Sequence, residues 1–300
     1  MIGVVSHDAG GAEVISSYIR RNSLDCIFCL DGAAVGVVAR KLGEVKVLQL
    51  SDLVTQCDWL LCGTSFLSDL EWRAIGLAHK AGKQCVAVLD HWVNYRQRFI
   101  RYGEWHFPDE VWVGDDIAAH IAAESLPEIP QTFVPNAYSM DIQDEIKAIK
   151  VPPCHLDDGL NLLYVCEPVR EDGIALYGDE RHWGYTEEEA LSYFLANLDA
   201  LGNKIARIVI RPHPQEALSK YDWVKQQFNL PLVCGEKKTL LEQISVCDVV
   251  IGCATMAMVV GLLAGKRVVS CLPPGAKTVP LPHVDIEDMS RLIAIRRFTS

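Results

Sequence analysis

Arg211-Pro212-His213-Pro214 is the segment whose residue types point most directly to chemistry. It follows the apolar run 205–210, which has the length and composition of a buried strand. Because proline cannot extend a strand ladder, the chain must turn here. In open α/β sheets, ligands bind outside the carboxyl ends of the strands. An arginine beside a histidine at that edge suits a phosphate or carboxylate group, and the alternative is a prolyl turn with a surface histidine.

A second anion-binding signal lies about forty residues further along the chain. A short apolar run at 249–251 leads into the small residues Gly252, Ala254 and Thr255, and an apolar helix is predicted at 256–264. The free N–H groups and the dipole of a helix start attract anions. Thr255 adds a hydroxyl or simply caps the helix, and a close-packed βα turn is the alternative for the whole segment.

Alternating strands and helices are predicted to position these residues. The predicted strands are 2–5, 26–30, 45–48, 59–62, 85–89, 110–113, 132–134, 161–165, 207–210, 232–234, 249–251 and 267–270. The predicted helices are 12–21, 32–42, 67–81, 117–124, 187–201, 223–227, 240–245, 256–264 and 287–296. Such alternation indicates doubly wound parallel sheets, and the polar segment 171–185 between two of these elements is predicted to be a mobile loop.

The chain is predicted to divide into two domains, 1–150 and 151–300, because a polar segment at 139–150 runs into Val151-Pro152-Pro153. The fold class is therefore α/β, with two tandem Rossmann-like domains whose strand ends face each other across a cleft. A ligand is expected in such a cleft.

Composition narrows the classes of partner and compartment. The 300 residues carry a net charge of −11, which argues against nucleic-acid binding. Met1 leads directly into a strand, so no signal peptide is expected, and no apolar stretch reaches the length of a membrane span. The eleven cysteines are odd in number and several lie in apolar runs, which predicts reduced thiols, no metal site and a cytoplasmic protein.

The tandem layout, the turn at Arg211–Pro214 and the helix start at Gly252–Thr255 resemble GT-B glycosyltransferases. The likeness is greatest to bacterial enzymes that use CMP-activated nonulosonic acids: sialyl, Kdo and pseudaminic acid transferases. Those families carry a His-Pro motif that contacts the CMP phosphate and a Ser/Thr-bearing helix start, matched here by His213-Pro214 and Thr255. The resemblance implies an inverting, metal-independent transfer from a CMP-sugar to a surface glycan or glycolipid, without a cofactor. Acceptors of this class are often lipid-linked, which allows peripheral membrane contact.

The resemblance assigns donor binding to the second domain. The residues expected there are Arg211, His213, Pro214, Gly252, Ala254, Thr255 and Glu167. Glu167, which follows the strand 161–165, is predicted to accept hydrogen bonds from a ribose or a cytosine amino group, and an exposed surface glutamate is the equal alternative.

The loop Ser6-His7-Asp8-Ala9-Gly10-Gly11 corresponds to the acceptor-facing loop of GT-B enzymes, which often supplies the base. An inverting transfer needs a group that takes the proton of the acceptor hydroxyl. Asp8 is the first candidate and His7 the second, with Asp90 and His91 in reserve. The alternative for Asp8 is a helix N-cap.

The acceptor is expected at the ends of neighbouring strands of the first domain. The residues assigned to it are Gly10, Gly11, Thr64, Ser65, Asp90, His91, Asn94 and Arg98. Trp92 and Tyr95 are predicted to stack on sugar faces, and Arg96 or Arg98 to hold an acceptor anion. The alternative is an ordered loop packed by its own aromatic side chains.

Two other classes of function remain open from the sequence. One is a nucleotide-sugar enzyme of the UDP-GlcNAc 2-epimerase type, or a transferase that uses a UDP-sugar. The other is a non-catalytic module that binds a sugar or a nucleotide.

Overall fold

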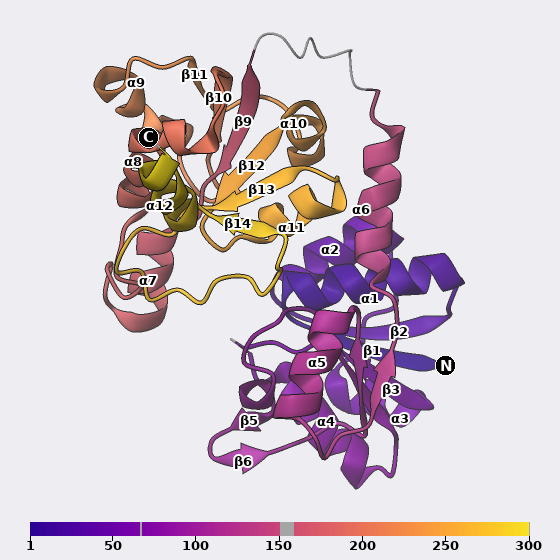
Figure 1. Cartoon of the computed structure of the whole chain (residues 1–300). Coiled ribbons are helices and arrows are strands. Elements are labelled where there is room, and N and C mark those ends of the chain that lie inside the picture. The colour runs from indigo at the N-terminus through magenta and orange to yellow at the C-terminus, as the bar shows by residue number, and fades with distance from the viewer. Residues whose placement is uncertain (67, 151–158, 300) are drawn as a thin grey trace. The chain divides into compact units, whose positions relative to one another are not determined.

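The computed structural model describes residues 1–66, 68–150 and 159–299 (Figure 1). The chain forms two compact units, Met1–Asp141 and Ile142–Ser300. The predicted domain break at Val151-Pro152-Pro153 lies outside the described residues. Each unit is an α/β domain built on one six-stranded parallel sheet.

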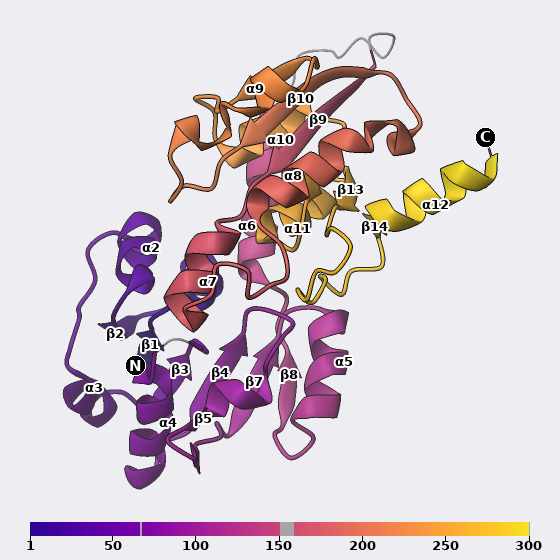
Figure 2. The same cartoon turned by 90° about the vertical axis from the view of Figure 1, so that its left-hand side faces the viewer.

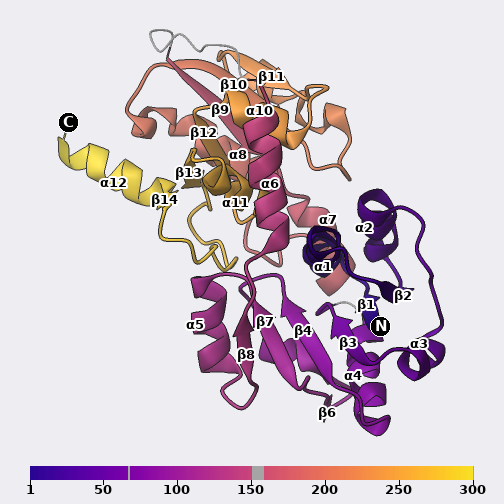
Figure 3. The same ribbon diagram turned by 90° about the vertical axis from the view of Figure 1, so that its right-hand side faces the viewer.

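The sheet of the first domain has the order β2-β1-β3-β4-β7-β8 (Figure 3). Its strands are β1 Ile2–Ser6, β2 Cys26–Leu30, β3 Trp59–Cys62, β4 Cys85–Leu89, β7 Glu110–Val113 and β8 Gln131–Phe133. All neighbouring strands are parallel. The central strands are almost entirely apolar because helices cover both of their faces, which is why the sequence predicts them well.

The helices of the first domain lie on both faces of this sheet. They are α1 Ala9–Asn22, α2 Ala33–Leu42, α3 Leu50–Gln56, α4 Leu70–Lys80 and α5 Asp116–Ser125. The helix α6 Ala137–Ala148 begins in the first unit and continues past its end at Asp141. Val4 packs with Ile15 of α1 on one face. A side chain at Gly3 would clash with Leu53 of α3 at 2.7 Å, so α3 lies on the opposite face.

Three features of the first domain differ from the prediction. The strand expected at 45–48 is wrong, since only Val47 pairs there, in a single bridge to Phe28. The helices α3 and α6 lie in segments for which no helix was predicted. After β4, a 3₁₀ turn at Arg96–Phe99 leads into a small antiparallel hairpin, β5 Ile100–Arg101 and β6 Glu104–Trp105.

The sheet of the second domain has the order β11-β10-β9-β12-β13-β14 (Figure 1; Figure 2 labels β9, β10, β13 and β14). Its strands are β9 Leu160–Val165, β10 Ile205–Arg211, β11 Leu232–Cys234, β12 Val249–Gly252, β13 Arg267–Ser270 and β14 Ile286–Asp288. Numbered by appearance, this is the 3-2-1-4-5-6 order of dinucleotide-binding Rossmann sheets. The prediction of two Rossmann-like domains is therefore confirmed.

The helical elements of the second domain also cover both faces of its sheet. They are α7 Val169–Tyr177, α8 Glu187–Ala196, a 3₁₀ turn Leu198–Leu201, a 3₁₀ turn Leu218–Tyr221, α9 Val224–Gln227, α10 Leu240–Val246, α11 Met256–Leu263 and α12 Met289–Thr299. Leu162 and Tyr164 of β9 form a core with Phe194 of α8. Gly261 of α11 packs on Val250 from the other face.

The prediction of a mobile loop at 171–185 is partly wrong, because α7 occupies nearly the first half of this segment. The helix α8 begins with a capping box. Thr186 Oγ1 accepts from the N–H of Glu189 at 3.3 Å, and Glu189 Oε2 accepts from the N–H of Thr186 at 2.9 Å.

The described cysteines are all free thiols. Within the described ranges, no helix is both long and apolar enough to cross a membrane.

Candidate functional site

Each sheet has one point where its connections diverge, which is where open α/β sheets bind ligands. In the first sheet, β1 connects outward to β2, and β3 returns to the other side of β1. In the second sheet, β9 leads outward to β10 and β11, and β12 returns beside β9. Four of the segments predicted to carry site residues begin at the ends of β1, β3, β9 and β12. They are residues 6–13 and 63–65 in the first domain, and residues 166–168 and 252–255 in the second.

His7 and Asp8 form a hydrogen-bonded pair at the first of these points, hereafter the His7–Asp8 pair. His7 Nδ1 lies 2.6 Å from Asp8 Oδ1, which also accepts from Ser65 Oγ at 2.9 Å. Asp8 occupies the N-cap position of α1, yet its side chain makes no capping hydrogen bond. Asp8 Oδ2 also accepts from the N–H of Phe66 at 3.4 Å, so the carboxylate is committed to His7 and to residues 65–66 and not to the helix.

The environment of His7 favours its protonated form. Partial burial lowers the pKa of His7, but the hydrogen bond to Asp8 and the negative charges of Asp8 and Glu71 outweigh this effect. The pKa of His7 therefore lies above its usual value. Both members of the pair remain accessible, with 24% of the His7 side chain and 33% of the Asp8 side chain exposed. An imidazole oriented by a carboxylate is an arrangement suited to proton transfer.

Glu71 of α4 holds the backbone of the pair in place, and the sequence did not predict this role. Its Oε1 accepts from the backbone N–H of His7 at 2.8 Å. Burial raises the pKa of Glu71 to about 7 against the effect of its backbone hydrogen bonds, and the charge of Asp8 adds to the increase. The available signal was spacing: Glu71 falls in register with Ala74, Ile75 and Ala78, which form the buried face of α4.

Gly10 and Gly11 make room for the chain's own groups. A Cβ on Gly10 would lie 2.0 Å from Asp90 Oδ2, and one on Gly11 would lie 3.1 Å from the Cα of Gly63. Backbone approach at these glycines brings the carboxyl ends of β1, β3 and β4 together. It also places the carboxylate of Asp90 beside the first turn of α1.

The expectation that Arg98 holds an acceptor anion is not supported by its contacts. Arg98 Nη1 donates to Asp90 Oδ1 at 2.9 Å, to the carbonyl of Thr64 at 2.6 Å and to Thr64 Oγ1 at 2.9 Å. Only 9% of the Arg98 side chain and 13% of the Asp90 side chain are exposed. The guanidinium thus takes part in a buried ion pair and links the residues that follow β3 to those that follow β4, and it is not available to an acceptor anion.

Thr64 and Ser65 are also buried, so their contacts hold the loops of the site together and do not face an acceptor. The predicted stacking of Trp92 and Tyr95 on sugar faces is wrong, because both rings are buried and Trp92 Nε1 donates to the carboxylate of Asp115 at 3.1 Å. The loop is packed by its own aromatic side chains.

Two other residues of this loop were assigned to the acceptor. His91 is half-buried, and its Nδ1 accepts from the N–H of Trp92 at 2.9 Å. Asn94 is exposed and adopts a φ of 57°, in the left-handed region that asparagine tolerates better than most residues.

The turn Pro212–Pro214 in the second domain presents His213, which is half-buried. Glu216 Oε2 accepts from the backbone N–H of His213 at 2.8 Å. His213 Nδ1 accepts from the N–H of Gln215 at 3.4 Å, which leaves the proton of the neutral imidazole on Nε2. The Nε2–H group is a donor of the kind that a phosphate requires.

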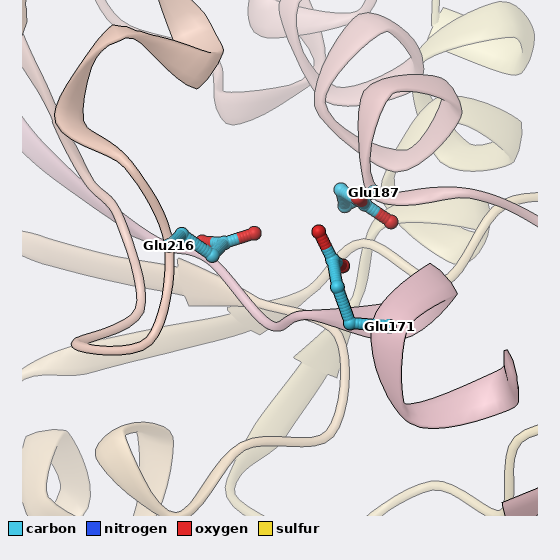
Figure 4. A group of neighbouring side chains, drawn as sticks. All are labelled: Glu171, Glu187 and Glu216. Atoms are coloured by element: carbon cyan, nitrogen blue, oxygen red, sulfur yellow. The ribbon is translucent and has the colours of Figure 1, made fainter. Parts of the chain in front are cut away.

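A cluster of three carboxylates, Glu171, Glu187 and Glu216, anchors this turn (Figure 4). Lys220 Nζ makes ion pairs with all three, at 2.8 Å to Glu171 and to Glu216. Burial lowers the pKa of Lys220, but hydrogen bonds to the three carboxylates raise it well above its usual value. The ammonium fills the place that a cation would take, so the cluster fixes the His213 turn to α7 and α8.

Arg211 does not lie beside His213 as predicted. Its Nη1 donates to Gln243 Oε1 of α10 at 2.6 Å and to the carbonyl of Lys238 at 2.9 Å. Since side chains alternate across a strand, the guanidinium is directed to the α10 face of the sheet.

The helix start predicted to bind phosphate is occupied by a carboxylate of the chain itself. Glu167 Oε1 accepts from the N–H groups of Cys253 at 3.0 Å and Ala254 at 2.9 Å. Burial raises the pKa of Glu167, although these N–H groups oppose the increase. The carboxylate that was expected to face a ribose or cytosine, or open solvent, is thus directed into the protein and joins β9 to the start of α11.

Thr255 and Gly252 have structural roles in this segment. Thr255 Oγ1 accepts from the N–H of Ala257 at 3.3 Å and caps α11. A Cβ on Gly252 would lie 2.9 Å from Val165, so a glycine is needed for close packing of β12 on β9.

Solved structures share this fold over nearly the whole chain, whereas no protein-family model and no curated protein sequence matches it. MnaA from S. aureus, in complex with UDP, superposes with a TM-score of 0.59 at 9% identity and covers 99% of this chain and 87% of its own. The UDP-GlcNAc 2-epimerase from Methanocaldococcus jannaschii gives 0.58 at 10% identity, with coverage of 99% and 91%.

A glycosyltransferase has the same architecture. The kitacinnamycin glycotransferase superposes with a TM-score of 0.55 at 11% identity and covers 98% of this chain and 83% of its own. The chain has the GT-B fold. This fold is shared by UDP-GlcNAc 2-epimerases and glycosyltransferases, and at such identities the likeness extends to the fold alone.

Proposed function

We propose that the chain is a glycosyltransferase that uses a UDP-sugar as donor. The observation that carries the proposal is the His7–Asp8 pair, which combines an oriented imidazole with an accessible carboxylate at the ligand-binding point of the first sheet. UDP replaces the CMP expected from the sequence, because MnaA, which shares the fold, was solved with UDP.

The proposed reaction assigns one task to each domain. The His7–Asp8 pair takes the proton of an acceptor hydroxyl, and the acceptor oxygen forms a bond to the anomeric carbon as the bond from that carbon to the UDP oxygen breaks. The electron pair leaves with UDP, whose developing charge is stabilised by the Nε2–H of His213. Because His7 and Asp8 are hydrogen-bonded, any pKa seen in the rate belongs to the pair.

The acceptor is proposed to be uncharged where it meets the first domain. The two cations expected to hold an anion are both paired, Arg98 with Asp90 and Arg96 with Glu128. The Asp8 and Asp90 carboxylates bring negative charge to this edge. A sugar hydroxyl fits these carboxylates as a hydrogen-bond donor.

The test is thermal stabilisation by UDP, CMP, GDP and CDP, followed by an assay of UDP release from UDP-sugars with and without oligosaccharide acceptors. A ligand that binds only the folded state raises the melting temperature. The proposal predicts a selective shift with UDP and UDP release that requires an acceptor. A shift with CMP alone would return the CMP-sugar donor to first place.

The second candidate is an enzyme of the UDP-GlcNAc 2-epimerase type, favoured by the coverage of the archaeal epimerase. Here the His7–Asp8 pair would remove the proton from C2 of the sugar. In D₂O, such an enzyme incorporates deuterium at C2 of UDP-GlcNAc without any acceptor, whereas a transferase does not. Nucleotide binding without turnover in either assay would indicate the binding module.

A further inference from the structure

A cavity of about 240 Å³ lies in the second domain, between strands β9 and β10 and helix α10. We call it the α10 cavity. It is lined by Asn161, Leu162, Leu163, Arg207, Val209, Glu236, Lys238, Gln243, Val246 and Cys247. Its volume far exceeds the roughly 10–15 Å³ that one water needs, and it is somewhat smaller than the pockets that hold drug-sized ligands.

Gln243 brings an unsatisfied donor to this cavity. Only 2% of Gln243 is exposed, and among the described residues its Nε2 has no hydrogen-bond partner. The orientation of the amide is fixed, because Oε1 accepts from Arg211 Nη1 at 2.6 Å and a guanidinium can only donate. The N–H₂ group therefore cannot exchange places with the oxygen. A buried donor without an acceptor is unfavourable, and a ligand acceptor would remove that cost.

The charges around the cavity favour an anion. Arg207 and Lys238 contribute two positive charges, and Glu236, paired with both, contributes one negative charge. Arg211 adds a further positive charge behind the amide of Gln243, and Asp248, which accepts from Asn161, adds a second negative charge, so three positive charges stand against two negative ones. The other side of the cavity is apolar, formed by side chains such as Leu163, Val209 and Val246.

We propose that the α10 cavity binds a small monocarboxylic acid with an apolar body. The carboxylate accepts from Gln243 Nε2 in the positive field of Arg207, Lys238 and Arg211, and the apolar body packs on Leu163 and Val246. The site is built from one face of the second domain and is independent of the proposed transferase activity.

The test uses 2-naphthoate as the probe and 2-naphthylmethylamine as a partner of similar size and opposite charge. Binding to the full chain is measured by isothermal titration calorimetry and by the shift of the Gln243 side-chain amide signal in NMR. The proposal predicts that the carboxylate binds and moves this signal, and that the amine does neither.

Gln243→Glu is the decisive variant, because it keeps an oxygen for Arg211 and replaces the N–H₂ donor with an acceptor. Affinity for 2-naphthoate is expected to fall at least tenfold. Gln226→Glu makes the same change at an exposed position of α9 and should bind as the wild type does.

Val246→Trp fills the cavity with a side chain from α10 and is the second test if Gln243→Glu does not fold. Because Val246 is only partly buried, this variant is expected to fold. It is expected to abolish binding. The proposal is overturned if the wild type does not bind 2-naphthoate at millimolar concentration, if the amine binds equally well, or if the folded variants bind the carboxylate unchanged.

Discussion

Asp8 and Glu167 occupy equivalent places in the two domains, each just after the strand from which its sheet diverges, yet their carboxylates make different contacts. Asp8 is hydrogen-bonded to the side chains of His7 and Ser65 and, over a longer distance, to the N–H of Phe66, and it leaves its own helix uncapped. Glu167 is bonded to backbone N–H groups at the start of α11. The comparison teaches that the place in the fold does not decide the role of a carboxylate, whereas its hydrogen-bond partner does.

The difference has an energetic side. N–H groups that lose their acceptor inside a protein cost free energy of folding, so Glu167 is expected to matter for stability. Asp8 has an accessible carboxylate and an imidazole partner, so it is expected to matter for proton transfer. Variants at the two positions should therefore fail in different assays.

The largest effect is expected from Asp8→Asn. The amide cannot take a proton or support a protonated His7, so kcat for sugar transfer should fall by about 10²–10⁴-fold. The melting-temperature shift produced by UDP should not change. The matched control is Asp52→Asn, at an exposed aspartate in the first turn of α3. A normal transfer rate for Asp8→Asn would remove the His7–Asp8 pair from the mechanism.

Lys220→Met tests whether the second domain depends on its ion pairs. Without the ammonium, Glu187 and Glu216 remain buried without this partner. The free energy of unfolding, measured with urea, should fall by about 3 kcal/mol. Lys225→Met, at an exposed lysine of α9, should change it by less than about 0.5 kcal/mol. Equal stability of the two variants would show that the cluster does not hold the His213 turn.

The stabilities of Glu167→Ala and Asp8→Ala test the comparison between the two carboxylates directly. Removing the Glu167 carboxylate leaves the N–H groups of Cys253 and Ala254 without their acceptor, and the free energy of unfolding should fall by about 2 kcal/mol. Asp8→Ala should cost less than about 0.5 kcal/mol, since no helix N–H loses a partner. Glu167→Gln keeps one acceptor oxygen and should lie between these values. The reverse order of the two alanine variants would refute the assignment of roles.

The last effect concerns Glu71 and pH. Burial raises the pKa of Glu71 to about 7 from the usual 4.5, so between these values the folded state binds a proton that the unfolded state has released. The stability that this group contributes is complete below pH 4.5 and is lost as the pH rises through 7, by about 3 kcal/mol. Urea unfolding at pH 5 and pH 8 should show this loss in the wild type.

Glu71→Gln should remove that part of the pH dependence because the amide does not titrate. The control Glu104→Gln, at an exposed glutamate in β6, should behave as the wild type does. An unchanged pH dependence in Glu71→Gln would mean that Glu71 is ionised throughout this range.

Much of the fold could be predicted from the sequence because buried parallel strands are continuous apolar runs. The exceptions have physical causes. The run at 45–48 is apolar enough for a strand, but it lies beyond the edge strand β2 and forms only the bridge of Val47. The helix α6 carries Asp141 among its buried residues, paired with Arg20, Arg21 and Lys41. A buried carboxylate breaks the apolar pattern, and its distant partners cannot be identified from the sequence.

The candidate site shows the same division. The loops could be predicted, because small and polar residues directly follow apolar strands in the sequence. The partners of Arg98 and Arg211 could not, since Thr64 and Gln243 are brought to them only by the sheet and the helix packing. Glu167 was assigned to a ligand because a sequence does not show that N–H groups 86 residues away will reach it first.

The contact between Gly11 and Gly63 has a mechanical consequence. With 3.1 Å between the Cα of Gly63 and the place where a Cβ of Gly11 would stand, the backbones of the two loops press on each other directly, without intervening side chains. A displacement of one loop is therefore expected to displace the other. Because Asp8 is also hydrogen-bonded to Ser65 across the same two loops, a bulky substitution at either glycine is expected to displace His7, Asp8 and Ser65 together.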